Sequence, residues 1–594
     1  MKQSISNTIK YLFKQNHIFW KQYISDNFDD SFFSIFMAQK GLEKIFRHQK
    51  MDSVEKKEII NEIKHKLPIH AEEIDKTYLF ITNFFPIFNQ LNSEITKALS
   101  ENFENSQLTF YYCLGMYIND NPDMISKAKN IIIVAAKKCL ANDLEAINYQ
   151  LSLELSESIY KRNKQVLDRL YQTAIKCGVI IEKYEAISFE SEYIKSIKTD
   201  LKCPELHLAL VNPQFELGLQ KGVLYHNYIL NNRMRGDYPG EVHSFYKCLI
   251  CKFCSLTLIS NGDKELAFEL LKRQYAQMNR TDLFYFYTSD FSSFVFSIIS
   301  LIYTELIKLI CCSDKLLFLL KRDRVRKEML WGDYISDDEF EEYYNMILEN
   351  KIIQEIFAVV GNDILIGRWQ FDNDFSIVET VKAITFDASK SVKAGQNSNH
   401  FGKDVFEKVI RGSLSSYGWK VLPFSVKIKC NGKIATDLDL VAYNQGIVIL
   451  GQVKVANCGR SRYDIWKTKH TINKAVEQIN LSMSRIHEDS NLIYSALKNQ
   501  GNTLKKEEIK KIIPVVITSS SLFMELDESS NISIISYDML CESMYHANEE
   551  ESMLIVEKAL TDPCSLYNFS FNEESVISRI IQDEYKIFYE EYEL

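Results

Sequence analysis

Four polar side chains interrupt two otherwise apolar segments late in the chain. The first segment reads TDLDLVAY and the second reads ILGQVKV. Because side chains alternate across a strand, Asp437 and Asp439 are expected on one face of the first segment. Gln452 and Lys454 are expected on one face of the second segment. Two carboxylates, an amide and an ammonium are groups that can act together on a charged substrate.

A turn between the two segments would bring their polar faces together. Residues 444–446, Asn-Gln-Gly, have the composition of a hairpin turn. Mg²⁺ prefers oxygen ligands and is typically held by one or two carboxylates plus a substrate phosphate. A lysine beside the metal orients the attacking water or offsets charge that develops on the phosphate. The spacing therefore indicates a metal site for phosphate chemistry, with these apolar side chains on the other face: Leu438, Leu440, Ala442, Val453 and Val455.

The motif resembles that of the PD-(D/E)xK nuclease superfamily, which has a restriction-endonuclease-like fold. The shared pattern is an aspartate, twelve intervening residues, and then Gln-x-Lys on the next strand. The segment HFGKDVFEKVIRGSLSSYGWKV resembles the helix that precedes the core sheet in this superfamily. The segment NKAVEQINLSMSRI resembles the helix that follows the Gln-x-Lys strand. The resemblance covers roughly residues 399–544.

The resemblance implies a role for each matching residue. Asp439 would be the main metal ligand, and Val453 would offer its main-chain carbonyl to the metal. Gln452 takes the place of the more usual acidic ligand, as in Mrr-like restriction endonucleases. Lys454 would be the catalytic lysine, and Glu407 would be the helix carboxylate that assists the metal site.

The glutamine is the departure from the usual pattern. An amide oxygen can bind Mg²⁺ but brings no charge, and Asp437 is expected to compensate as a further ligand. The motif predicts a Mg²⁺-dependent endonuclease, with Mn²⁺ as a substitute, that hydrolyses phosphodiester bonds of DNA rather than RNA. The resemblance also points to a bacterial restriction or anti-phage defence effector.

The sequence leaves three alternatives to a nuclease open. The Asp-x-Asp strand can be a solvated edge strand in which Lys454 simply pairs with Asp439. The fold can also have lost catalysis and serve only to bind nucleic acid or to scaffold a complex. In the third alternative the chain is a helical interaction protein whose C-terminal domain assembles complexes.

Charge distribution supports a nucleic-acid partner. Residues 391–486 carry fifteen Lys and Arg against six Asp and Glu, whereas the whole chain has a net charge of −9. A basic segment in an acidic chain is an electrostatic footprint for phosphate contact, although solvated helix faces can give the same count. The candidate nucleic-acid contacts are Lys427, Lys429, Lys433, Arg460, Arg462, Lys467 and Lys469, with Tyr463 and Trp466 as stacking surfaces.

The pattern along the chain predicts a multidomain protein. A large, mostly α-helical N-terminal region is expected before an α/β restriction-endonuclease-like domain with a central mixed sheet. Within the first region, one long periodic helix is expected to end at Gly178. The expected divisions are a helical region over 1–350, a β-hairpin element over 351–386, a linker over 387–400, the nuclease domain over 401–545 and a helical tail over 546–594.

Several other segments have two interpretations each. A helix followed by the hairpin of residues 355–371 is compatible with a winged-helix-like module or with a hairpin packed on its neighbours. Cys248, Cys251 and Cys254 have the spacing of a metal site but lie in an apolar stretch that suits a buried helix. His470, Lys474 and Gln478 lie at helical spacing and face either the site or solvent.

Composition and termini indicate an intracellular protein. The thirteen cysteines and the absence of a secretory leader predict reduced thiols and a cytoplasmic location. The uncharged stretch over 291–304 is shorter than the roughly 20 residues of a membrane span, so a buried helix is expected. No membrane contact is expected. The helical N-terminal region is expected to recognise a protein partner or to form an oligomer.

Overall fold

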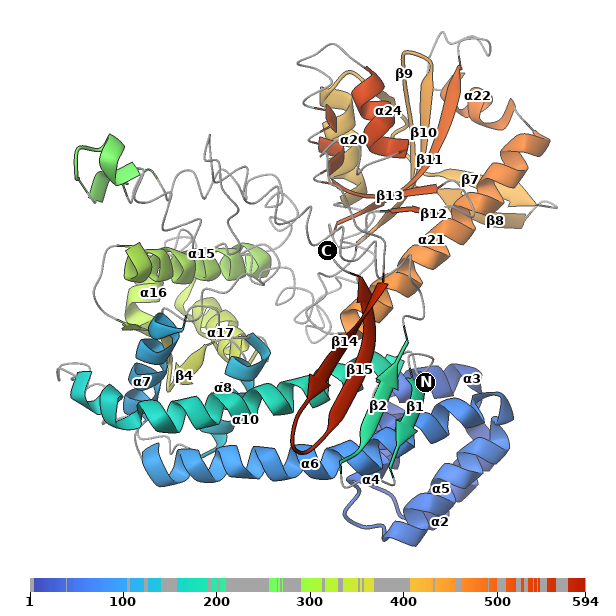
Figure 1. Ribbon diagram of the computed structural model, residues 1–594. Coiled ribbons are helices and arrows are strands. Elements are labelled where there is room, and N and C mark those ends of the chain that lie inside the picture. The colour runs from blue at the N-terminus through green and yellow to red at the C-terminus, as the bar shows by residue number, and fades with distance from the viewer. Residues whose placement is uncertain are drawn as a thin grey trace.

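The computed structural model shows a helical N-terminal body, a small mixed module and a C-terminal α/β domain (Figure 1). This confirms the expectation of a large helical region followed by a mixed sheet. The linker predicted at 387–400 and the cysteine run at 248–254 lie outside the described residues. The structure describes residues 5–38, 40–103, 107–121, 126–139, 157–189, 194–199, 203–209, 256–263, 265–267, 270, 290–311, 316–328, 335–350, 353–354, 357–367, 406–430, 433–455, 462–489, 491–498, 509–519, 525–527, 532–537, 539–541, 543–544, 553–561 and 575–592.

Helices with capped starts build the N-terminal body. Asp52 accepts from the main-chain N–H groups of Val54 and Glu55, and the Glu55 side chain accepts from the Asp52 N–H. Asn16 accepts from the Phe19 N–H in the same way. These bonds satisfy donors that a helix start leaves free, so they fix where the helices begin. The elements are α1 (Ile5–Leu12), α2 (His17–Asn27), α3 (Asp30–Ala38), α4 (Gly41–Phe46), α5 (Ser53–Lys66), the 3-10 turn η1 (Pro68–His70), α6 (Ala71–Phe103), α7 (Gln107–Asp120), α8 (Ser126–Cys139) and α10 (Glu157–Phe189).

The two long helices α6 and α10 pack together through an aromatic core. The rings of Phe80 and Phe84 stack with centroids 4.6 Å apart, and the ring of Tyr184 stacks on Phe80 at 6.0 Å. All three side chains are buried. The predicted helix end at Gly178 is wrong, because α10 runs through it to Phe189. The apolar stripe continues on Tyr184 and Ile187, and their burial outweighs the local cost of a helical glycine.

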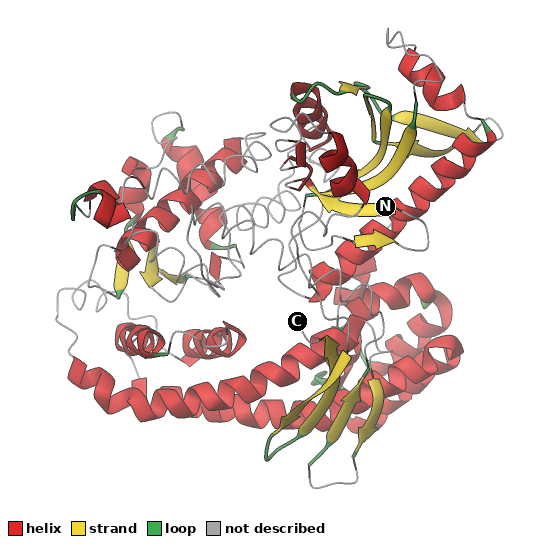
Figure 2. Cartoon of the chain, turned by 45° about the horizontal axis from the view of Figure 1, so that its top comes forward, coloured by secondary structure: helices red, strands yellow, loops and turns green. Residues whose placement is uncertain are grey.

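A four-stranded sheet joins segments from distant parts of the chain. Its order is β1 (Ile194–Lys198), β2 (Glu205–Leu208), β15 (Lys586–Tyr592) and β14 (Ser575–Ile581), and it lies across the long helices (Figure 2). The prediction of a helical tail over 546–594 is therefore wrong for residues 575–592. Within the tail, α24 (Met553–Thr561) is helical. The strands form because buried Tyr585 and Ile587 alternate with half-buried Lys586, which is the period of a strand.

The small module combines helices with a three-stranded sheet. Its elements are α15 (Asp290–Cys311), β3 (Leu317–Leu320), α16 (Arg322–Glu328), α17 (Asp337–Leu348), β4 (Ala358–Val360) and β5 (Asp363–Gly367), and the sheet order is β3-β5-β4. The hairpin predicted within 351–386 is β4–β5. Its partner β3 comes from the region predicted to be helical. The pairing of the hairpin with a strand between two helices favours the winged-helix-like alternative over a simple hairpin.

The apolar stretch of the module is a core helix, as predicted. Phe294, Ile298 and Ile302 of α15 are buried in the module. In the described parts of the chain, no helix is both long and apolar enough to cross a bilayer. The exposed side chains of α17 are largely acidic, including Asp338 and Glu342, and their charge would repel a phosphate.

The C-terminal domain, residues 406–561, has a six-stranded mixed sheet with the order β12-β13-β11-β10-β9-β6. The strands β6, β9 and β10 pair antiparallel, whereas β11 and β13 run parallel to β10 and β11 respectively. Its elements are α20 (Glu407–Ser416), β6 (Lys420–Val421), β9 (Leu440–Asn444), β10 (Ile447–Lys454), α21 (Arg462–Glu488), α22 (Asn491–Lys498), β11 (Lys511–Thr518), β12 (Glu525–Asp527), β13 (Ile532–Ser536) and α24.

Helices cover both faces of this sheet. Ile410 of α20 lies in one apolar cluster with Ile449 and Val453 of β10. Ile479 of α21 packs on Val516 of β11 on the opposite face. Strands that are covered on both sides are continuous apolar runs, which explains why β10 and β11 were visible in the sequence.

A separate two-stranded ribbon, β7 (Val426–Cys430) and β8 (Lys433–Leu438), leads into the sheet. The chain bends at Asp439 before β9 begins at Leu440. Leu438 shares a cluster with Val441, whereas Leu440 and Ala442 pack on the opposite side. The prediction that Leu438, Leu440 and Ala442 share one face is wrong, because the bend shifts the alternation.

Candidate active site

The hairpin between β9 and β10 forms as predicted and sets the register of the site. Asn444 pairs with Ile447, so Gln445 and Gly446 make a two-residue turn. Both turn residues have positive φ, 45° and 92° respectively. A turn of this kind matches the twist of two antiparallel strands. The hairpin therefore brings the start of β9 beside the end of β10, where the polar residues lie.

Asp439, Gln452 and Lys454 meet at that end of the hairpin. The Lys454 Nζ lies 2.7 Å from Gln452 Oε1 and 3.3 Å from Asp439 Oδ2. The side chain of Asp439 is 6 % exposed and that of Lys454 is 21 % exposed. One oxygen from β10 and one from the bend before β9 thus converge on one ammonium group in a largely desolvated place, where charge interactions are strong.

Gln452 is fully buried and both ends of its amide are bonded. Its Nε2 donates to the main-chain oxygen of Asp437, and its Oε1 accepts from Lys454. A buried amide without such partners would cost roughly 1–3 kcal/mol per unsatisfied group. These bonds fix the orientation of the amide, so its oxygen points toward the ammonium group.

Val453 contributes its main-chain N–H to the site. That N–H donates to Asp439 Oδ2 at 3.1 Å, and the side chain packs on the opposite face of the sheet. The predicted separation of Val453 from the polar side chains is confirmed. Asp439 Oδ2 therefore receives two donors, one from the main chain and one from Lys454.

Glu407 is buried on α20 and forms an ion pair with Arg411. The Arg411 Nη2 donates to Glu407 Oε2 at 2.8 Å and to the main-chain oxygen of Asp439 at 2.6 Å. The side chain of Glu407 is 6 % exposed and that of Arg411 is 14 % exposed. Glu407 thus reaches the bend through Arg411. The sequence reasoning did not select Arg411, although its position four residues after Glu407 is the spacing of a helical ion pair.

Asp437 reaches the site through its main chain. Its carbonyl oxygen accepts from Gln452, and its half-buried side chain belongs to the ribbon, in register with Lys427. No hydrogen bond or ion pair joins its carboxylate to Asp439, Gln452 or Lys454 among the described residues.

The predicted nucleic-acid contacts lie on the ribbon and on α21. Lys427 of β7 is exposed, and Lys469 of α21 is half-buried. On α21, His470 and Lys474 are exposed and Gln478 is half-buried. The other predicted contacts are Lys429 in β7, Lys433 in β8, and Arg462, Tyr463, Trp466 and Lys467 in α21, whereas Arg460 lies outside the described residues.

The donor set of the site is oxygen-rich but carries little charge. Within the described residues, no three His, Cys, Asp or Glu side chains gather as a metal site. Asp439 supplies one carboxylate and Gln452 supplies a neutral oxygen, which suits a hard cation that keeps waters and takes further ligands from a substrate.

Comparisons of the chain with protein-family models, curated proteins and solved structures returned no match.

Proposed function

We propose that the C-terminal domain is a metal-dependent nuclease of the PD-(D/E)xK type that hydrolyses phosphodiester bonds, with DNA as the substrate. The observation that carries the proposal is the convergence of Asp439, Gln452 and Lys454 at one end of two neighbouring strands. The motif requires these three residue types to act on one phosphate. Sequence spacing alone does not demand that they meet.

The order of elements around the site adds support. The motif resemblance expects a helix before the core sheet, the aspartate and Gln-x-Lys on adjacent strands, and a helix afterwards. The chain has α20, then the antiparallel β6, β9 and β10, then α21, then β11 parallel to β10. The order of helices and strands therefore agrees with the order that the motif predicts, and this agreement supports a nuclease fold.

The residues present fit Mg²⁺ or Mn²⁺, which Asp439 and Gln452 would hold. When bound, the ion supplies Lewis-acid stabilisation and activates a water. Lys454 would then be free of its pair with Asp439, and its ammonium group would face the phosphate and offset charge there. Arg411 holds the bend that carries Asp439, so it keeps the carboxylate in place.

We propose a biological role in defence as well. The motif resemblance alone suggests a bacterial restriction or anti-phage effector. In that proposal, the helical body recognises a partner or forms an oligomer and thereby regulates the nuclease.

A second candidate function is nucleic-acid binding without hydrolysis. Lys454 already neutralises Asp439, and Gln452 has partners at both ends, so the site is satisfied without a metal. A nuclease fold that has lost catalysis would have this arrangement.

Cleavage of plasmid DNA separates the two functions. Purified full-length protein is incubated with Mg²⁺ or Mn²⁺, beside Asp439→Ala and Lys454→Ala variants. Metal-dependent nicking that is lost in both variants supports hydrolysis. Glu477→Ala and Lys408→Ala are matched controls, since both residues are exposed in the same domain and should retain full activity. Intact DNA in every lane, with binding retained, would leave the second function.

A further inference from the structure

The ribbon β7–β8 has one face fixed against helices and one face open. Val426, Ile428 and Leu438 point inward and cluster with Ile486 of α21 and Leu497 of α22. Figure 1 shows the ribbon beside α21, and in the described part of the chain its strands pair only with each other. Because its inner face is anchored, the ribbon is a preformed element and not a loose loop.

The open face carries Lys427, and the ribbon also exposes an apolar side chain, Ile434. Lys427 is exposed and lies opposite half-buried Asp437 across the ribbon. Among the described residues, no carboxylate forms an ion pair with Lys427. After an irregularity in the register, Lys429 lies opposite Ile434, which is 56 % exposed. Together with Lys433, the ribbon has three lysines against one aspartate.

We propose that this ribbon is the duplex-binding element of the C-terminal domain and lies in the major groove of DNA. The inference rests on the proposed nuclease function for its substrate class. A two-stranded ribbon fits a groove about 12 Å wide, since paired strands lie about 4.8 Å apart. Lysines flanking the groove contact phosphates, and an exposed isoleucine suits the methyl group of thymine.

The ribbon also places the duplex at the site. Its second strand ends at Leu438, and the next residue is Asp439. The main-chain oxygen of Asp437, still in the ribbon, is bonded to Gln452. Lys427 is in register with Asp437, so a phosphate backbone that contacts Lys427 would pass beside the carboxylate and ammonium groups that would act on it.

Binding without cleavage tests this element. Full-length protein is titrated in EDTA against a fluorescent blunt duplex and against its single strand, over a series of salt concentrations. The Lys427→Ala/Lys429→Ala variant should bind the duplex severalfold more weakly, and its salt slope should fall by about two. Lys408→Ala/Lys558→Ala is the matched control, since these exposed lysines lie on α20 and α24 over the other face of the sheet.

A second variant, Lys427→Glu, changes one exposed side chain and guards against misfolding of the double variant. It should weaken duplex binding further by repulsion. Unchanged affinity and salt slope in both variants would overturn the inference, as would an equal loss for single strands. Weakened binding in these variants without any plasmid cleavage by the wild type would leave the ribbon assignment intact and remove the nuclease function.

Discussion

Arg411 links the helix before the sheet to the bend that carries Asp439. One nitrogen of its guanidinium group bonds both the Glu407 carboxylate and the Asp439 carbonyl. Asp439 lies between two strands, so its main chain lacks the ladder bonds that hold a strand residue. Because the side chains of Arg411 and Glu407 are nearly excluded from water, loss of either removes a buried ion pair from the other.

Replacing Arg411 should therefore affect both stability and turnover. Arg411→Ala is expected to lower the free energy of unfolding by about 3–5 kcal/mol, the cost of breaking a buried pair. The cleavage rate at saturating DNA should fall about 10–100-fold in protein that remains folded, as when a support of a metal ligand is removed. Urea unfolding measures the free energy of unfolding. Initial rates of DNA cleavage, taken without urea and well below the melting temperature, measure turnover.

Two comparisons separate positioning from simple stabilisation. Arg411→Lys keeps the charge and should recover part of the rate. Arg485→Ala removes an arginine of the same domain whose pair with Glu488 is half-exposed, so its rate should match the wild type. A destabilised Arg411→Ala protein with an unchanged rate at saturating DNA would show that Arg411 only stabilises the fold.

The site was partly predictable from the sequence. Alternation within one strand places Gln452 and Lys454 on the same face, and their side chains do meet. The same rule failed before Asp439, because it assumes an unbroken strand and the chain bends there. The part played by Arg411 was not predictable, since it depends on how closely α20 approaches the bend.

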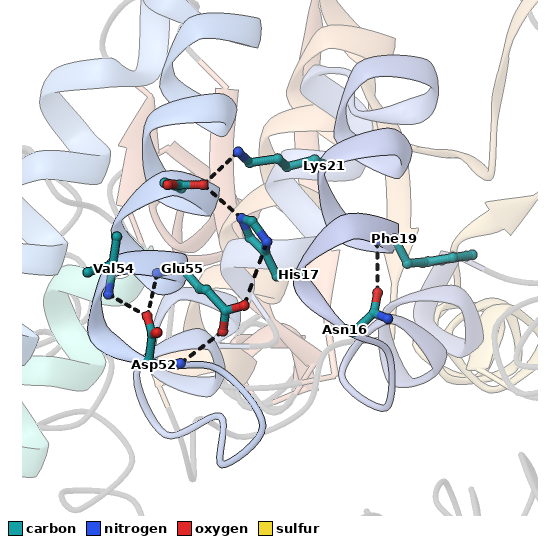
Figure 3. A network of polar contacts seen from close by, with 8 residues as sticks. Asn16, His17, Phe19, Lys21, Asp52, Val54 and Glu55 are labelled. Carbon is teal, nitrogen blue, oxygen red and sulfur yellow. Dashed lines mark hydrogen bonds and ion pairs between the residues drawn. The ribbon is translucent and has the colours of Figure 1, made fainter.

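At the scale of elements, α2 and α5 are joined by a polar network (Figure 3). Glu58 accepts from Lys21 Nζ at 2.6 Å and lies 2.9 Å from His17 Nε2. The hydrogen bond from Lys21 is the main cause that holds the pKa of the Glu58 carboxyl below its usual range, and the bond with His17 lowers that pKa further. The charged form of Glu58 is therefore favoured in the folded state.

The network should make this helix pair sensitive to acid. A carboxyl whose pKa is lower in the folded state stabilises the protein above its unfolded pKa, about 4.3, and this stability is lost as the pH falls through the folded pKa. Glu58→Gln should therefore lower the melting temperature at pH 7, and the gap from the wild type should close at lower pH. Thermal melts from pH 7 down to acid pH measure this difference in melting temperature. Glu101→Gln, which changes an exposed carboxylate, is the control.

Replacing two glycines of the C-terminal domain with alanine should change the free energy of unfolding in opposite directions. A Cβ added at Gly451 of β10 would lie 3.1 Å from Leu440 Cβ on the paired strand. Gly451→Ala should thus cost about 1–3 kcal/mol by crowding the start of β9. A Cβ at Gly412 of α20 meets nothing within 4 Å, so Gly412→Ala should add about 0.5–1 kcal/mol through helix propensity. Equilibrium unfolding of the two variants should give shifts of opposite sign.

The sequence predicts whether a segment is a helix or a strand better than it predicts which strands pair with each other. Buried strands such as β11, rich in valine and isoleucine, stand out in the sequence because both faces are covered. The C-terminal hairpin was missed because its acidic residues, such as Glu590 and Glu591, suggested a helix. Its strand partner β2 is distant in sequence, and such a pairing leaves no local signal.

At the scale of the whole molecule, the C-terminal domain is attached to the N-terminal body in two ways. The small module and the C-terminal domain both lie between β2 and β14 in the chain, and these strands belong to one sheet on the body. In addition, α21 contacts α10. The last strand of the chain therefore completes a sheet near its beginning, so changes at the C-terminus should be felt in the N-terminal helices.

Tyr585 is the side chain through which this closure is best tested. It is fully buried, its hydroxyl donates to the main-chain oxygen of Lys176 at 2.9 Å, and its ring lies 6.2 Å from that of Phe84. Tyr585→Ala should cost about 3–5 kcal/mol, the usual range for truncating a buried aromatic ring. Tyr585→Phe removes only the hydrogen bond and should cost about 1 kcal/mol.

Where Tyr585→Ala destabilises the protein tests the closure more directly than the size of the loss in stability. Because Tyr585 packs between α6 and α10, hydrogen exchange in Tyr585→Ala should rise in peptides from these two helices, far from the substitution in sequence. Ile577→Ala on the neighbouring strand is the control, since that side chain is 65 % exposed and its loss should cost less than about 0.5 kcal/mol. Faster exchange confined to residues 575–592 would mean that the hairpin docks on the body without stabilising it.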